Sequence, residues 1–194
     1  MNNPQIRMAS AMIVGCFALF WFGIKIILGS ELSMMWRGFD VVEVLVLYYS
    51  RTGRTEALAK AIVEGVESVK GASAKMKRVD YATVNDFISC DAVAFGSPNY
   101  FSYMAGVMKD FFDKALSIRE RVAGKPSASF TSGGGSSNSA LLSLERMISS
   151  FRLEKVADGA VSHGEPSEEN LKACKKLGET LAWRALERAE VPKD

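Results

Sequence analysis

Apolar stretches alternate with amphipathic stretches along the chain from about residue 40 to its C-terminal end. The first apolar stretch, 41–49, carries a single charge, Glu43, and is rich in valine and leucine, as is typical of a strand buried on both faces. The next stretch has apolar residues at helical spacing and predicts a helix with one buried face. The residues of this face are Ala57, Leu58, Ala61, Ile62, Gly65 and Val66.

The same alternation continues to the end of the chain. Runs of small and β-branched apolar residues predict four further strands, at Ala74–Val79, Ala92–Gly96, Ser127–Thr131 and Val156–Val161. Helical periodicity predicts helices at Val84–Ser89, Ala105–Ser117, Ala140–Ser150 and Glu168–Glu190. The helix predicted at Ala105–Ser117 should bury a stripe made of Met104, Val107, Met108, Phe111, Phe112 and Ala115. Five strands that alternate with helices predict an α/β domain whose parallel sheet is covered by helices on both faces.

The loop after the first strand carries several hydroxyl groups and opens a helix. Its residues are Ser50, Arg51, Thr52, Gly53, Arg54 and Thr55. Free N–H groups at a helix start attract anions, and the hydroxyls of Ser50, Thr52 and Thr55 would donate to a phosphate. The loop has neither the Gly-Lys-Ser/Thr ending of a nucleotide triphosphatase nor the three glycines of a dinucleotide fingerprint. The alternative is a hydroxyl-rich helix N-cap that binds no ligand.

Two further loops lie where parallel sheets bind ligands, beyond the carboxyl ends of the third and fourth strands. The first consists of Ser97, Pro98, Asn99, Tyr100, Phe101, Ser102 and Tyr103. Its aromatic rings would stack on a flat heteroaromatic ligand or pack under the following helix, and we expect at least one to pack there. The second consists of Thr131, Ser132, Gly133, Gly134 and Gly135. Its small residues allow a ligand to approach the backbone closely, although a flexible linker would have the same composition.

Together these loops resemble, in order and spacing, those of flavodoxin-like FMN-binding proteins over about residues 40–190. The resemblance is greatest to short members allied to the tryptophan-repressor-binding-protein-like NAD(P)H:quinone oxidoreductases. It implies a flavodoxin-like three-layer sandwich with a five-stranded parallel sheet in the order 2-1-3-4-5, and FMN as the cofactor. By this resemblance, residues 50–55 hold the ribityl phosphate, 97–103 flank the isoalloxazine ring, and 131–135 meet its pyrimidine edge.

Two departures from the electron-carrier flavodoxins favour an enzyme. The loop after the fourth strand lacks an aromatic residue, and 24 Lys and Arg nearly balance 22 Asp and Glu where the carriers are strongly acidic. We expect hydride transfer from NAD(P)H through the flavin to a quinone or a similar small acceptor, with a neighbouring subunit of a homo-oligomer as a plausible cover for the ring. The alternatives are an electron carrier that serves a partner protein and an interaction domain without a redox role. Against the quinone reductases, the chain lacks their long insertion.

The histidine, the cysteines and the net charge limit the kinds of function that the chain can have. No catalytic side chain is needed, since a flavin accepts hydride itself. The one histidine, His163, is expected beyond the last strand, either at the flavin edge as a proton donor or in solvent. A net charge of only +2 lacks the strong positive excess that is typical of nucleic-acid-binding proteins. The cysteines Cys16, Cys90 and Cys174 have neither metal-site nor disulfide spacing, which favours a reducing compartment.

The segment that precedes the domain, 1–39, has its own character. Residues 8–28 are almost wholly apolar, with Lys25 as the only charge, and are long enough to cross a bilayer. Three interpretations remain open: a membrane anchor, a cleaved signal peptide, or a chain that begins at Met34 or Met35. Counting Lys25 with Arg37 as flanking charges, an anchor would leave the domain, 40–194, in the cytoplasm.

Overall fold

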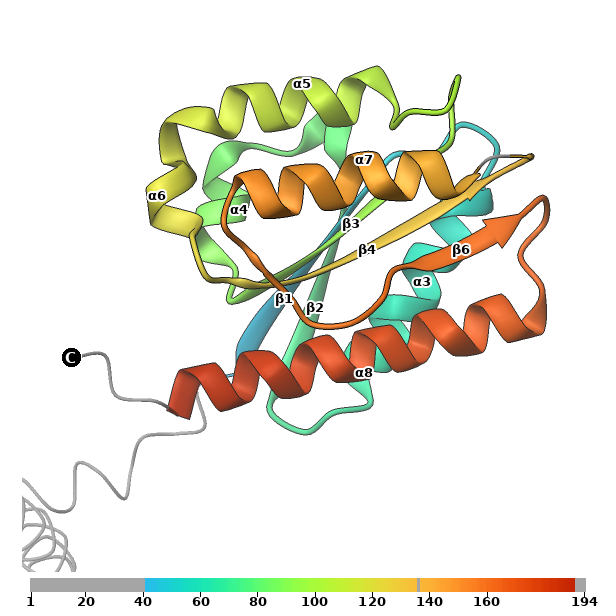
Figure 1. The fold of residues 1–194 in the computed structure, drawn as a ribbon. Coiled ribbons are helices and arrows are strands. Elements are labelled where there is room, and N and C mark those ends of the chain that lie inside the picture. The colour runs from blue at the N-terminus through green and yellow to red at the C-terminus, as the bar shows by residue number, and fades with distance from the viewer. Residues whose placement is uncertain (1–40, 136, 191–194) are drawn as a thin grey trace, which may run out of the picture. The chain divides into compact units, whose positions relative to one another are not determined.

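A parallel sheet in the order β2-β1-β3-β4-β5 runs through the middle of the domain (Figure 1). The computed structural model describes residues 41–135 and 137–190. The strands are β1 (Val42–Tyr48), β2 (Ala72–Arg78), β3 (Ala92–Pro98), β4 (Pro126–Gly133), β5 (Glu154–Lys155) and β6 (Ala160–His163). Every pairing among them is parallel. The predicted fold class and strand order are therefore confirmed.

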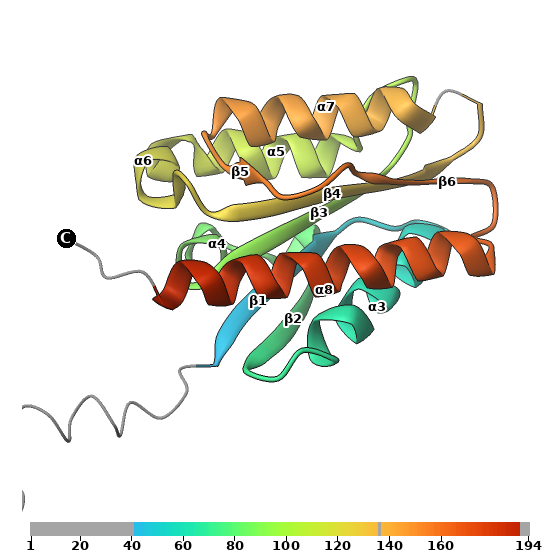
Figure 2. The same cartoon turned by 60° about the horizontal axis from the view of Figure 1, so that its bottom comes forward.

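Helices cover both faces of this sheet, as Figures 1 and 2 show. On one side lie α3 (Arg54–Glu67) and α8 (Glu168–Glu190). The other side carries α4 (Val84–Ser89), α5 (Gly106–Ala115), α6 (Arg119–Val122) and α7 (Ser137–Ser150). Two short 3-10 turns, η1 (Val79–Tyr81) and η2 (Leu116–Ile118), follow β2 and α5.

The alternation of side chains along β1 explains its continuous apolar run. Val44 and Val46 join the core beneath α3 and α8, whereas Leu45 and Leu47 join the core beneath α5 and α7. All four are fully buried. Successive side chains of a strand point to opposite faces, so a strand between two helical layers needs apolar residues at every position.

Two glycines bring the backbones of α3 and α8 into direct contact. A Cβ atom on Gly65 would lie 2.0 Å from the Lys175 carbonyl oxygen, and one on Gly178 would lie 2.2 Å from the Ile62 carbonyl oxygen. Only glycine fits at these two positions. The apolar face predicted for α3 thus includes Gly65 for a reason of shape rather than hydrophobicity.

The expected last strand is wrong as a single element. The chain pairs with β4 twice, first through β5 with Lys155 opposite Ser127, then through β6 with Ala160 opposite Phe130. Four residues separate Lys155 from Ala160 where β4 has only two, so the chain must leave the ladder between them. Gly159 lies in this break, where a Cβ would come within 2.6 Å of the Ser129 hydroxyl oxygen.

The stripe expected on α5 also needs one correction, because Val107 is exposed. The helix begins only at Gly106, and its buried residues are Met108, Phe111, Phe112 and Ala115. Met104 lies before the helix and is buried in the same core, so its position does not set the phase of the helical face. The apolar run 8–28 and Cys16 lie outside the described residues. Among the helices of the described ranges, none has the length and apolar character to cross a membrane.

Candidate functional site

The turn between β1 and α3 has the geometry of an anion site. Gly53 is the N-cap of α3 and has a φ of 90°, a left-handed conformation that favours glycine. The Gly53 N–H donates to the Ser50 hydroxyl oxygen at 3.1 Å, which closes the turn. The Ala57 N–H donates to the Gly53 carbonyl at 2.8 Å, so the earlier N–H groups of the helix have no acceptor inside it. Such groups, at the positive end of a 14-residue helix, attract an anion.

The three hydroxyls expected to face a phosphate occupy different surroundings. Ser50 is buried, and its oxygen is engaged by the Gly53 N–H. Thr55 is also buried, and its Oγ1 lies 2.7 Å from the Ser132 Oγ on β4. Thr52 is exposed. Ser50 therefore shapes the turn, Thr55 ties it to the sheet, and Thr52 has its hydroxyl at the surface.

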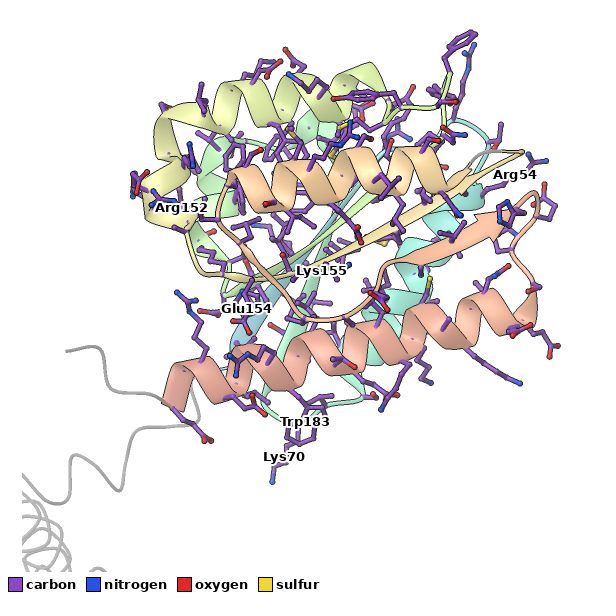
Figure 3. All side chains as sticks on the ribbon, in the orientation of Figure 1. Arg54, Lys70, Arg152, Glu154, Lys155 and Trp183 are labelled. Atoms are coloured by element: carbon purple, nitrogen blue, oxygen red, sulfur yellow. The ribbon has the colours of Figure 1, made fainter. Side chains whose placement is uncertain are left out.

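Three guanidinium groups surround this turn. The Nη1 of Arg78, on β2, donates to the Ser50 carbonyl oxygen at 2.7 Å, and its Nη2 lies 2.7 Å from an Asp80 carboxylate oxygen. The Nε of Arg54 donates to Glu165 Oε1 at 2.6 Å, and Arg54 lies at the start of α3 (Figure 3). Arg51 is exposed. Sequence reasoning missed Arg78 and Glu165, because each reaches the turn from a distant part of the chain and no local pattern marks it.

The loop after β3 ends in a tight hairpin turn. Tyr100 and Tyr103 exchange two backbone hydrogen bonds, at 2.9 and 3.0 Å, around Phe101 and Ser102. Both central residues have positive φ, 50° and 63°, as in type I′ turns. A bulky residue pays a conformational cost there, and such strain gathers at functional positions. Phe101 at the tip is fully exposed.

The prediction that one of the three aromatic rings packs under α5 is wrong. None of the three rings is buried: Tyr100 and Tyr103 are 37% and 40% exposed, and Phe101 is fully exposed. Tyr100 instead meets Tyr49 edge to face, with ring centroids 6.5 Å apart. Burial, together with the neighbouring Tyr49, raises the pKa of the Tyr100 phenol above its ordinary value, and Arg51 opposes this shift. Ser97 is buried at the base, where its Oγ accepts from the Ala105 N–H at 2.8 Å.

The loop after β4 lies directly against the loop after β3. The Thr131 hydroxyl donates to the Ser97 carbonyl at 2.7 Å, and the Asn99 N–H donates to the Ser132 carbonyl at 2.8 Å. A Cβ on Gly133 would lie 2.9 Å from the Asn99 Cβ, so this close approach requires glycine. Gly133 belongs to the ladder as the last residue of β4, whereas Gly134 and Gly135 are exposed.

One buried acceptor at this junction has no partner among the described residues, the Oδ1 atom of Asn99. Buried carbonyl oxygens are nearly always hydrogen-bonded in folded proteins. Pro98, the residue before Asn99, ends β3 opposite Ser132 and fixes the start of this loop. An unpaired acceptor in one of two adjoining ligand loops is suited to an N–H donor on a bound molecule.

A fourth segment, which the sequence indicated only through His163, joins the other three loops. His163 is the last residue of β6 rather than a residue beyond it, and it pairs with Gly133. The Gly164 N–H donates to the Gly133 carbonyl at 2.9 Å, and Glu165 then reaches Arg54. The structure therefore brings all three predicted loops to one edge of the sheet and adds residues 163–165 to them.

Other features of the described residues offer no competing centre of chemistry. Burial raises the pKa of the Cys90 thiol to about 11 and that of Cys174 to about 12, which makes both poor nucleophiles. Across residues 41–135 and 137–190, no three His, Cys, Asp or Glu side chains gather to hold a metal ion. Grooves of about 290 and 320 Å³ lie between α3 and α8 and beside Trp183 (Figure 3), and neither includes residues of the four loops.

Comparison with known proteins agrees with this arrangement. The family model for flavodoxin matches residues 46–178. A flavodoxin of Aquifex aeolicus is 36% identical over 162 residues, which cover 74% of this chain and 88% of that protein. An NAD(P)H dehydrogenase (quinone) of Syntrophobacter fumaroxidans is 32% identical over 151 residues, which cover 64% of this chain and 72% of that protein. Among solved structures, a flavodoxin from the domain Archaea has 27% identity and a TM-score of 0.67, covering 74% of this chain and 99% of that one.

Proposed function

The chain belongs to the flavodoxin family, with FMN as its cofactor, and we propose that it is an NAD(P)H-dependent oxidoreductase that reduces a quinone or a similar small acceptor. One observation carries the choice of an enzyme. In the described part of the loop that follows β4, Gly134 and Gly135 are exposed, and nothing lies within 4 Å of the place where either would carry a Cβ. A ring bound at this edge would keep space on one side for a donor and then for an acceptor.

The residues at the site fit FMN. The free N–H groups at the start of α3 suit the phosphate dianion, and the exposed Thr52 hydroxyl adds a donor. The ring carries an N–H group, for which the unpaired Asn99 Oδ1 is a matching acceptor. Tyr100 and Tyr103 offer aromatic surface to the ring, and FMN when bound supplies the redox chemistry itself.

The chain's own residues would control placement and polarity. The hairpin turn at Phe101 and the β4 loop are joined by the Asn99–Ser132 hydrogen bond, which holds the two sides of the ring site together. Backbone N–H groups near Gly134 and Gly135 would stabilise negative charge on the pyrimidine edge. His163 pairs with Gly133 in the β4–β6 ladder and therefore lies at the same edge of the sheet.

A second candidate is an electron carrier that serves a partner protein. The match to a flavodoxin over most of its length favours it, and so does the fully exposed Phe101, which would contact a partner. The near balance of charge argues against it, because carriers that dock through an acidic surface have a large net negative charge.

An anaerobic titration of the full chain separates these functions. The protein is loaded with FMN, NADPH or NADH is added, and the visible absorbance of the flavin is followed. Prompt bleaching that a quinone reverses supports the oxidoreductase. Bound flavin that neither NADPH nor NADH reduces, but that dithionite does reduce, supports the carrier. A chain that binds no FMN contradicts both functions.

A further inference from the structure

Three buried hydroxyls form a row beneath the phosphate turn, Thr55 on α3, Ser132 on β4 and Ser162 on β6. They are 1%, 2% and 0% exposed. The Thr55 and Ser132 oxygens lie 2.7 Å apart, and either can be the donor. Ser132 and Ser162 lie opposite each other in the β4–β6 ladder, so both side chains point to the same face of the sheet.

The hydroxyl of Ser162 has no hydrogen-bond partner within the described part of the chain. A buried hydroxyl without a partner is destabilising, so its presence next to Ser132 calls for a reason. Ser129 provides a comparison on the same strand. It is equally buried and also unpaired, but it points to the opposite face, beside Gly159.

We propose that Ser132 is a positioning residue for the FMN phosphate: its hydroxyl donates to Thr55 Oγ1, so that the Thr55 proton is directed to a phosphate oxygen. This inference rests on the proposed FMN site. Each hydroxyl has one proton to donate and can accept in return. When Thr55 donates to the phosphate, it must accept from Ser132, and the Ser132 oxygen is then free to accept from Ser162.

Only this direction of hydrogen bonding uses all three protons. If Thr55 donated to Ser132 instead, no proton of Thr55 would remain for the phosphate, and the anion would lose one hydroxyl donor. No proton is transferred in the proposed arrangement; the row sets only the direction of the hydrogen bonds. Chains of aligned hydrogen bonds strengthen one another, so the effect should reach the phosphate from Ser132.

The test compares two ligands that differ only in the phosphate. Dissociation constants of the full-length apoprotein are measured for FMN and for riboflavin through the quenching of flavin fluorescence. For Ser132→Ala we expect the FMN constant to rise about fivefold, and the riboflavin constant to stay within about twofold. For the matched control Ser129→Ala, the ratio of the two constants should equal that of the wild type. An unchanged ratio in Ser132→Ala overturns the inference.

A double-mutant cycle shows whether Ser132 acts through Thr55. Thr55→Val removes the hydroxyl at similar volume, and in that background Ser132→Ala should have no further effect on the ratio. Additive effects would show that the two residues act separately and would overturn the inference. The conservative variant Thr55→Ser keeps a hydroxyl and should retain the full effect of Ser132→Ala.

Two measurements keep the outcome interpretable. Thermal unfolding identifies any variant that fails to fold, and Ser162→Ala then replaces Ser132→Ala, with an expected loss of about twofold in the same ratio. An unchanged ratio of the FMN and riboflavin constants in a folded Ser162→Ala variant contradicts the proposed hydrogen bond from Ser162 to Ser132. A wild type without any preference for FMN over riboflavin would contradict the FMN site itself, whereas a normal wild-type preference with an unaffected Ser132→Ala contradicts only the role of Ser132.

Discussion

Asp86 joins the start of α4 to β2 through a nearly buried carboxylate, and its replacement by asparagine tests how much that junction contributes. Its Oδ2 accepts from the Lys77 Nζ, the Thr83 N–H and the Thr83 hydroxyl, each at 2.8 Å. Its Oδ1 lies 3.0 Å from the Lys75 Nζ. The Asp86 side chain is 9% exposed, whereas those of Lys75 and Lys77 are 41% and 29% exposed. Both ammonium groups thus keep contact with water after the change.

The size of the effect follows from these contacts. The helix-capping interaction with Thr83 contributes about 1 kcal/mol, and each partly exposed ion pair about 0.5–1 kcal/mol. Asp86→Asn should therefore lower the free energy of unfolding by about 2–3 kcal/mol and Tm by about 5–10 °C. The control is Asp110→Asn, which removes an exposed carboxylate 2.6 Å from Lys114 and should change the free energy by less than about 0.5 kcal/mol.

The lowered pKa of Asp86 also predicts how its contribution to stability changes with pH. Burial alone would raise the pKa of Asp86, but hydrogen bonds from Lys77, Thr83 and Lys75 together hold it well below its ordinary value. A carboxyl whose pKa is lowered by folding stabilises the protein above its unfolded pKa of about 4, and this contribution is lost as the pH falls through the folded value. Urea unfolding followed by circular dichroism should show a constant difference between wild type and Asp86→Asn from about pH 6 to 8. The ion pairs should contribute less as the pH falls below about 4.

Two results would refute this reasoning. One is an Asp86→Asn variant as stable as Asp110→Asn at neutral pH, since the buried contacts would then contribute nothing measurable. The other is a difference between wild type and Asp86→Asn that grows as the pH is lowered below about 4, because the linkage requires the opposite sign.

Three further substitutions test packing, phosphate recognition and access to the ring. Gly178→Ala places a Cβ 2.2 Å from a backbone oxygen of α3 and should cost more than about 3 kcal/mol in urea unfolding, whereas Gly106→Ala, with nothing within 4 Å, should not destabilise. Glu165→Gln frees the Arg54 guanidinium and removes a negative charge; both side chains are exposed, so FMN affinity should rise only about two- to fivefold, with riboflavin unaffected in the same fluorescence titration. Gly134→Leu should reduce NAD(P)H turnover far more than FMN affinity, and equal losses would count against the open ring face.

The fold was predictable because its determinants are local. A strand between two helical layers must be apolar along its buried length, and β1 is so from Val44 to Tyr48; an amphipathic helix must repeat its apolar positions, and α3 does. The break between β5 and β6 was not predictable in this way. It depends on the approach of Gly159 to Ser129, 30 positions earlier in the chain, and a run of apolar residues carries no sign of that contact.

The candidate site was predictable as a set of loops but not as a set of contacts. Chain order and composition identify residues 50–55, 97–103 and 131–135, since ligand loops follow the carboxyl ends of strands. The contacts that decide which side chains are available are long-range ones. Thr55 meets Ser132 across 77 positions and Arg54 meets Glu165 across 111, so the Thr55 hydroxyl, which the sequence assigns to a phosphate, and the Arg54 guanidinium already have partners in the fold.

The two ends of the site differ in how firmly they are built, and this difference bears on function. At the phosphate end, Gly53 and Ser50 bond to each other and Thr55 is tied to the sheet. At the ring end, Tyr100 and Tyr103 are each more than one-third exposed, and the glycines beyond β4 leave open space. A redox site needs its ring within reach of other molecules, so little affinity can come from enclosure there. The phosphate end must then supply most of the binding free energy, and removal of the phosphate should weaken binding more than any single substitution beside the ring.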